Sequence, residues 1–221
     1  MKTIEISIPV YGNTLVGNLN IPHDSESLII FSHGSGSSRF SKRNMHVANL
    51  LNQTKMATLL IDLLTAKEDE EYENRFDIDL LSQRLISVTD YVTKLPDLKN
   101  LPVGYFGAST GAASAIKAAA HLHRGIFAVV SRGGRPDLAD TDLKFIQAPT
   151  LLIVGSLDGV VIELNKQAYK FLKCDKKLEI IDGATHLFEE PGMLDKVADL
   201  AKSWFQEHNL NLKTNKHVLH K

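Results

Sequence analysis

Cysteine, long apolar runs and net charge are almost absent from the sequence. Cys174 is the only cysteine among 221 residues, so no disulfide can form within the chain, and this fits a reducing compartment. No apolar run approaches the roughly 20 residues that a membrane helix needs. The first residues alternate between apolar and polar types and lack the apolar core of a signal peptide. We therefore expect a cytoplasmic protein without a membrane partner.

The formal net charge is −1, which gives no electrostatic reason to expect a nucleic-acid partner. Hydrophobic residues make up 43% and charged residues 23% of the chain, as in ordinary soluble globular proteins. No internal repeat and no Gly/Ser-rich or Pro-rich linker divides it. We expect one domain over residues 1–209, followed by a polar, frayed C-terminal tail over residues 210–221.

The apolar pattern begins with a hairpin. Residues 3–10 alternate, a turn follows at 11–13, and residues 15–21 form a second strand. Short strands that are apolar on both faces then alternate with helical stretches. The predicted strands are 27–32, 58–62, 103–106, 127–131, 150–155 and 177–181, and the predicted helices are about 41–54, 77–94, 110–123, 163–173 and 193–208.

Strands of this kind, alternating with helices, form mostly parallel sheets covered on both faces. We predict a three-layer α/β sandwich of about eight strands, to which the opening hairpin adds an antiparallel edge. The acidic stretch 67–74 is expected to be a solvated loop or the start of a helix.

The most informative motif is Gly107-Ala108-Ser109-Thr110-Gly111, which follows one predicted strand and precedes a predicted helix. It matches G-x-S-x-G in the strand–turn–helix setting that presents a nucleophilic serine. Side chains two positions away would collide with the sharp turn, and glycine removes them. Ser109 is therefore the predicted nucleophile, although a small-residue turn could simply pack a helix on the sheet.

A serine hydroxyl needs a base, and the base needs a carboxylate to orient it. With this type of nucleophile the chain order is Ser, then Asp or Glu, then His. Asp158 and His186 each follow a late predicted strand and are the predicted acid and base. Asp62 and Asp182 compete for the acid, and the histidines that compete for the base are His33, His46, His121 and His123.

Acyl transfer also needs N–H donors for the oxyanion of the tetrahedral intermediate. The backbone N–H of Thr110 is one candidate because it directly follows the nucleophile. The glycine-rich loop after the strand 27–32 supplies the other, with Ser35 as first choice and Gly36 as second. His33 is expected to brace this loop.

With these motifs in place, the chain resembles the α/β-hydrolase superfamily over nearly its whole length. The stretches HGSGSSRFSKRN, LLIDLLT and SRGGRPDL are similar to members of the dienelactone-hydrolase-like group, which has no large cap domain. The resemblance implies ester hydrolysis through an acyl-serine, with no metal and no organic cofactor. Dienelactone hydrolases proper carry cysteine where this chain has Ser109, so dienelactone itself is not the expected substrate.

Four arginines follow predicted strands at the edge where the motifs lie, namely Arg39, Arg43, Arg132 and Arg135. Arginine binds carboxylate or phosphate with two parallel hydrogen bonds, so Arg39, Arg132 and Arg135 are candidates for binding an anionic substrate. The alternative is ion pairing with nearby acids such as Asp62 or Asp137.

The sequence therefore predicts a serine hydrolase that cleaves a small carboxyl ester or thioester. Two other functions fit the same fold. A non-catalytic receptor would use the pocket without the nucleophile, and an acyltransferase would pass the acyl group to an acceptor other than water. The expected partner is a small acyl substrate in all but the receptor case.

Overall fold

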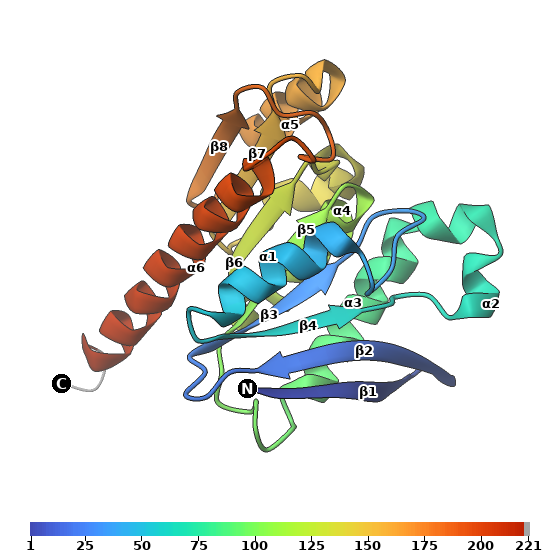
Figure 1. Ribbon diagram of the computed structural model, residues 1–221, viewed down its shortest axis with the longest axis vertical. Helices are drawn as coiled ribbons and strands as arrows, with labels where there is room; N and C mark the ends of the chain where they lie inside the picture. Colours follow the sequence, from blue (N-terminus) through green and yellow to red (C-terminus); the bar gives the residue numbers. More distant parts are fainter. Residues whose placement is uncertain (219–221) are drawn as a thin grey trace.

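The sheet of the computed structural model has eight strands in the order β1-β2-β4-β3-β5-β6-β7-β8, and the structure describes residues 1–218, without the side chains of 124, 213 and 215–218 (Figure 1). Antiparallel pairing is confined to β1–β2 and β2–β4, and every other pair is parallel. The predicted antiparallel edge on a mostly parallel sheet is confirmed. The strands are β1 (Lys2–Val10), β2 (Asn13–Ile21), β3 (Ser27–Ser32), β4 (Met56–Ile61), β5 (Val103–Ala108), β6 (Ile126–Arg132), β7 (Thr150–Gly155) and β8 (Lys176–Ile181).

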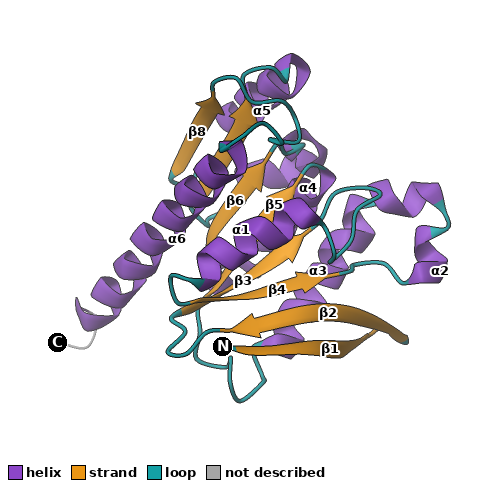
Figure 2. Ribbon diagram, viewed as in Figure 1, coloured by secondary structure: helices purple, strands orange, loops and turns teal. Residues whose placement is uncertain are grey.

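Helices cover both faces of the sheet, which confirms the three layers (Figure 2). One face packs on α1 (Lys42–Asn52) and α6 (Met193–Val218), and the other on α3 (Ile78–Val92), α4 (Thr110–Leu122) and α5 (Gly159–Phe171). Four short helices complete the chain, namely α2 (Ala66–Asp69), η1 (Tyr72–Phe76), η2 (His123–Gly125) and η3 (Pro136–Lys144). No large cap interrupts the elements within residues 1–218.

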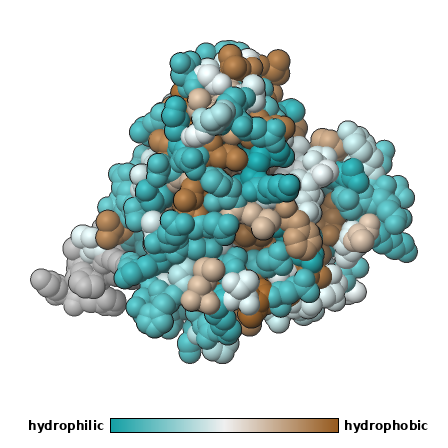
Figure 3. Space-filling model, in the orientation of Figure 1, coloured by the Kyte–Doolittle hydropathy of each residue, from teal (hydrophilic) through white to brown (hydrophobic). Residues whose placement is uncertain are grey.

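Each face of the sheet has its own apolar core. Strands β3 to β7 are buried on both faces, as their uninterrupted apolar sequences predict. The outer surface over α1 and α6 is mostly hydrophilic, with apolar residues in small patches (Figure 3). Within the described part of the chain, we find no helix with the length and apolarity needed to cross a membrane.

The C-terminal helix is longer than predicted. It runs to Val218, so residues 210–218 are helical where a frayed tail was expected, and 219–221 of that tail lie outside the described residues. Leu212 packs on the same core cluster as Phe205, which continues the apolar face of the helix past residue 209. Helix α5 also begins earlier than predicted, at Gly159.

The acidic stretch forms α2 and part of η1. Most of it is exposed, as predicted, but Glu68 turns inward and pairs with Arg84 of α3. Because the parallel strands all end at one edge of the sheet, the loops after β3, β5, β6, β7 and β8 meet there. This edge positions every predicted site residue.

Candidate active site

Ser109 lies in a sharp turn between β5 and α4. Its backbone has φ 53° and ψ −123°, which is a strained conformation for a residue with a side chain. The flanking glycines allow the turn to form. A Cβ at Gly107 would lie 2.4 Å from Ala112 Cα, and one at Gly111 would lie 2.2 Å from Ser32 O. The crowding that the motif predicted is therefore present at both glycine positions.

Asp158 and His186 come together across two loops. Asp158 follows β7 and directly precedes α5, whereas His186 follows β8. The Nδ1–H of His186 donates a 2.6 Å hydrogen bond to Asp158 Oδ2. This bond fixes the ring orientation and leaves Nε2 as the proton acceptor. The Asp158 side chain is 15% exposed and that of His186 is 39% exposed, so the base is open to solvent while its partner is sheltered.

The competing acids and bases have other partners. Asp62 accepts hydrogen bonds from the backbone N–H and the guanidinium of Arg39, and Asp182 accepts one from Ser156 Oγ at 3.3 Å. Among the histidines, His46 pairs with Asp195 and His121 lies near Asp142. Asp158 and His186 are the one acid–base pair among these candidates within hydrogen-bond distance, since His33 Nε2 lies 3.8 Å from Asp62 Oδ1.

Residues 132–135 connect Ser109 to His186. Ser109 N–H donates to Arg132 O at 3.2 Å, and Arg135 N–H donates to Ser109 O at 3.0 Å. Gly133, with φ 51°, lies against the base, since a Cβ there would be 3.0 Å from His186 O and 3.5 Å from its Cε1. Sequence reasoning missed this bridge. Its only signal is the glycine pair directly after β6.

Two glutamates hold the loop that carries His186. Glu190 accepts hydrogen bonds from Thr185 N–H at 3.2 Å and from Thr185 Oγ1 at 2.5 Å, and these bonds lower the pKa of Glu190. Glu189 pairs with Arg43 of α1 at 2.5 Å. The base is therefore anchored both within its own loop and to the neighbouring helix. Neither contact was predicted, because each joins residues with no shared motif.

The glycine-rich loop after β3 packs directly on the nucleophile. A Cβ at Gly34 would lie 2.9 Å from Ser109 Cβ and 3.6 Å from its Oγ. Ser35 N–H donates to Thr110 Oγ1 at 2.9 Å. The predicted oxyanion donor Ser35 is thus beside the nucleophile, but a side-chain hydroxyl occupies its N–H. Gly36 has φ 66°, a backbone conformation that glycine adopts without strain.

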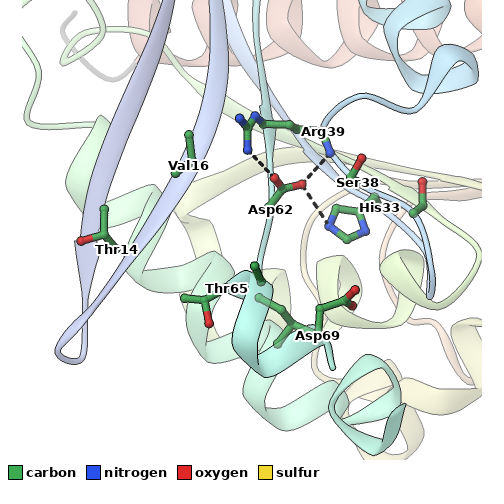
Figure 4. A pocket seen from close by; sticks show the side chains of 11 residues that line it. Thr14, Val16, His33, Ser38, Arg39, Asp62, Thr65 and Asp69 are labelled. Carbon is green, nitrogen blue, oxygen red and sulfur yellow. Dashed lines mark hydrogen bonds and ion pairs between the residues drawn. The ribbon is translucent and has the colours of Figure 1, made fainter. Parts of the chain in front are cut away.

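A cavity of about 300 Å³ lies behind this loop, between the end of β4 and α2 (Figure 4). Asp62 is at its centre, with both carboxylate oxygens 2.6 Å from donors of Arg39. His33 Nδ1 hydrogen-bonds to Gly34 O at 3.0 Å, and its Nε2 is 3.8 Å from Asp62 Oδ1. These contacts place His33 as a brace of the loop.

The predicted substrate-binding arginines differ in their partners. Arg39 pairs with Asp62 and Glu5, and Arg135 forms a two-pronged pair with Asp137. Ion pairing, the alternative to anion binding, therefore accounts for both. Arg132 is buried and pairs with no acid of the described chain, and its Nη2 lies 3.4 Å from Asn44 Oδ1.

Comparisons with known proteins agree on the fold. A dienelactone hydrolase from Anabaena variabilis, known from its crystal structure, is 51% identical with a TM-score of 0.91, covering 93% of this chain and 97% of that one. Est1E from Butyrivibrio proteoclasticus has a TM-score of 0.79 at 20% identity, over 92% of this chain and 98% of its own, which shows the fold alone. No protein-family model matches the chain.

Proteins from two Mycobacterium tuberculosis strains are also similar, and both carry the provisional name phosphoribosyl transferase. They are 53% identical over 208 residues, which is 94% of this chain and 47% of theirs. The chain therefore spans about half the length of these curated relatives.

Proposed function

Because the chain belongs to the dienelactone-hydrolase family of α/β-hydrolases, we propose that it is a serine hydrolase that cleaves a small carboxyl ester or thioester. One observation carries this proposal. Ser109 has the strained backbone of a nucleophile turn, and the loop that bonds to its backbone also lies against His186, which is hydrogen-bonded to Asp158. A binding pocket without chemistry has no need of such an arrangement.

In the first step Ser109 Oγ attacks the acyl carbon and His186 Nε2 takes its proton. Asp158 stabilises the imidazolium through Nδ1–H. The oxyanion forms beside the N–H of Thr110, the first residue of α4, which has no acceptor within the helix. The Ser35 N–H becomes a second donor once it exchanges Thr110 Oγ1 for the oxyanion.

The imidazolium then gives its proton to the leaving oxygen or sulfur, and the C–O or C–S bond breaks to leave an acyl-serine. Water attacks this ester while His186 Nε2 takes a proton from it. The second intermediate expels Ser109 Oγ, which recovers its proton from His186 and releases the carboxylic acid. These steps use groups of the protein and water.

The mycobacterial relatives suggest a different activity by name. Their matched half has this hydrolase-related sequence, and the other half has no counterpart in this chain. We propose that the phosphoribosyl transferase name describes a function outside the matched half. The chemistry assigned to the present chain then stays that of acyl transfer to water.

The proposal is tested by reaction with a fluorophosphonate, followed by peptide mass spectrometry. We expect one adduct, on Ser109, which is lost in Ser109→Ala and greatly slowed in His186→Ala. Substituting His46, an exposed histidine paired with Asp195, by alanine provides the matched control and preserves labelling. Folded protein that takes no label at Ser109 would favour a receptor instead.

A labelled enzyme could still be an acyltransferase. Turnover of an ester in the presence of hydroxylamine or an added alcohol distinguishes a hydrolase from an acyltransferase. Each of these added acceptors competes with water for the same acyl-serine. A hydrolase releases mostly acid at modest acceptor concentrations. Release of the transfer product alone would contradict the assignment to hydrolysis.

A further inference from the structure

Arg132 is an unusual residue for the interior of this fold. It is 6% exposed, and its Nε and Nη1 have no hydrogen-bond partner in the described chain. Its remaining contact is the long one to Asn44 Oδ1. A guanidinium has five N–H donors, and burying its charge without a partner is costly. Native proteins keep such a group buried where another partner, such as a ligand, accepts its hydrogen bonds.

The surroundings of Arg132 are positive. Asn44 lies in the first turn of α1, where the helix dipole favours an anion, and its own N–H is capped by Ser41 Oγ. Arg43 is in the same turn, and its acidic partner Glu189 is 60% exposed at the solvent side. Burial and the nearby Arg43 charge lower the pKa of Arg132 to about 10, which leaves it charged at neutral pH.

Arg132 is also adjacent to the nucleophile. Its carbonyl accepts the Ser109 N–H, and the residue after it lies against His186. In the parallel register of β5 and β6, Arg132 lies opposite Ala108, the residue before the nucleophile, on a strand about 4.8 Å away. Its side chain extends to the face of the sheet that α1 covers, as the contact with Asn44 shows.

We propose that Arg132, together with Arg43 and the first turn of α1, binds a carboxylate or phosphate group of the substrate that Ser109 attacks. The inference rests on the proposed hydrolase function and adds the substrate class to it. A carboxylate or phosphate supplies the two parallel acceptors that a guanidinium prefers. Arg39, Arg43 and Arg135 pair with Asp62, Glu189 and Asp137, and Arg132 is the one of these four arginines that has no acidic partner in the described chain.

Three esters of similar length test this recognition. Ethyl butyrate is neutral, monoethyl succinate carries a carboxylate in its acyl part, and O-butyryl glycolate carries one in its alcohol part. We expect the wild type to prefer one of the anionic esters. In Arg132→Met the ratio of kcat/KM for that ester over ethyl butyrate falls at least about tenfold, because a charge-assisted hydrogen bond is lost. Arg43→Met lowers the ratio less.

Arg75→Met is the matched control, since the guanidinium of Arg75 in η1 belongs to a pair with Asp69, and it keeps the wild-type ratio. Arg132→Met is expected to fold, because methionine replaces a buried charge that has no acidic partner. Its melting temperature without added anion is therefore equal to or above that of wild type. A marked fall would identify Arg132 as purely structural and overturn the proposal.

A binding measurement separates this inference from the proposed chemistry. In Ser109→Ala, succinate and inorganic phosphate are expected to raise the melting temperature, and Arg132→Met in that background abolishes the shift. Anion protection with no Arg132-dependent ester preference would mean a free anion occupies the site, which overturns substrate recognition. If wild type hydrolyses ethyl butyrate but neither preference nor protection is seen, the inference fails while the hydrolase function stands. If no ester is cleaved and Ser109 takes no fluorophosphonate, the proposed function fails.

Discussion

Two buried arginines allow a comparison between the two regions on either side of Ser109. Arg84 of α3 is 3% exposed, and both of its terminal nitrogens bond to Glu68 of α2. Arg132 is 6% exposed and has no such carboxylate. We call residues 62–76 with Arg84 the α2 region, and residues 132–137 with Asp158 and 182–190 the His186 region. Burial alone does not distinguish the two arginines, whereas the carboxylate that pairs with Arg84 has no counterpart at Arg132.

The largest expected effect concerns turnover and should be confined to the His186 region. Asp158→Asn keeps the shape of the site but replaces the carboxylate that fixes the His186 tautomer with a neutral amide that can itself donate. By analogy with serine proteases, kcat should fall about 10⁴-fold. Steady-state hydrolysis of ethyl butyrate measures this. Asp182→Asn, which loses an acceptor in the same region without touching His186, should keep kcat near wild type. Equal losses in the two variants would remove the special role given to Asp158.

The second effect concerns stability and belongs to the α2 region. Glu68→Gln leaves Arg84 buried without a carboxylate, which should lower the free energy of unfolding by about 2–3 kcal/mol. Urea unfolding at pH 7 gives this value. Glu71→Gln, an exposed change beside α2, is the control and should leave it unchanged. If Arg132→Met destabilised the protein as much as Glu68→Gln, the contrast between the two arginines would be broken.

The same pair predicts a pH dependence. Burial raises the pKa of Glu68, but hydrogen bonds from Arg84 and Thr65 outweigh it and bring the pKa below its ordinary value of 4.5. A carboxylate with a lowered pKa stabilises the fold above its unfolded-state pKa and loses that contribution as the pH falls through the folded value. The stability difference between wild type and Glu68→Gln should therefore shrink below about pH 4.5.

The smallest effect lies at the boundary of the two regions, where Thr110 Oγ1 holds the Ser35 N–H. Thr110→Val keeps the shape of the residue but removes this acceptor, so the loop after β3 is less well aligned. Losing one hydrogen bond costs about 1 kcal/mol, or about fivefold in kcat. Thr110→Ser keeps the hydroxyl and should restore kcat. Faster turnover in Thr110→Val would show that releasing the Ser35 N–H from Thr110 Oγ1 slows the reaction more than this bond helps by aligning the loop.

Local rules made much of the molecule predictable. Strands buried on both faces read as uninterrupted apolar runs, and the G-x-S-x-G turn needs glycines only because of its own backbone. The pairing of Asp158 with His186 follows from their places after β7 and β8, since parallel strands end at one edge. Their catalytic roles, like that of Ser109, stay predictions.

Contacts between distant segments were not predictable. The approach of Gly133 to His186 and the pairing of Glu68 with Arg84 each depend on distances that no single stretch of sequence encodes. The same holds for the arginines, which looked equivalent in the sequence. Only the fold shows which of them meet carboxylates. The extension of α6 was missed because Leu212 gains its packing partners only when the helix lies on the sheet.

The turn at Ser109 takes its shape without help from the Ser109 hydroxyl. Its shape is fixed by a positive φ and by glycines that contact backbone atoms, none of which involves the hydroxyl. Exchanging oxygen for sulfur at position 109 would therefore alter one atom on a backbone that is already set. In this family, where dienelactone hydrolases are expected to carry cysteine, the backbone positions the side chain and allows either oxygen or sulfur as the attacking atom. Architecture and reactivity can then evolve separately, and a change of chemistry costs a single substitution.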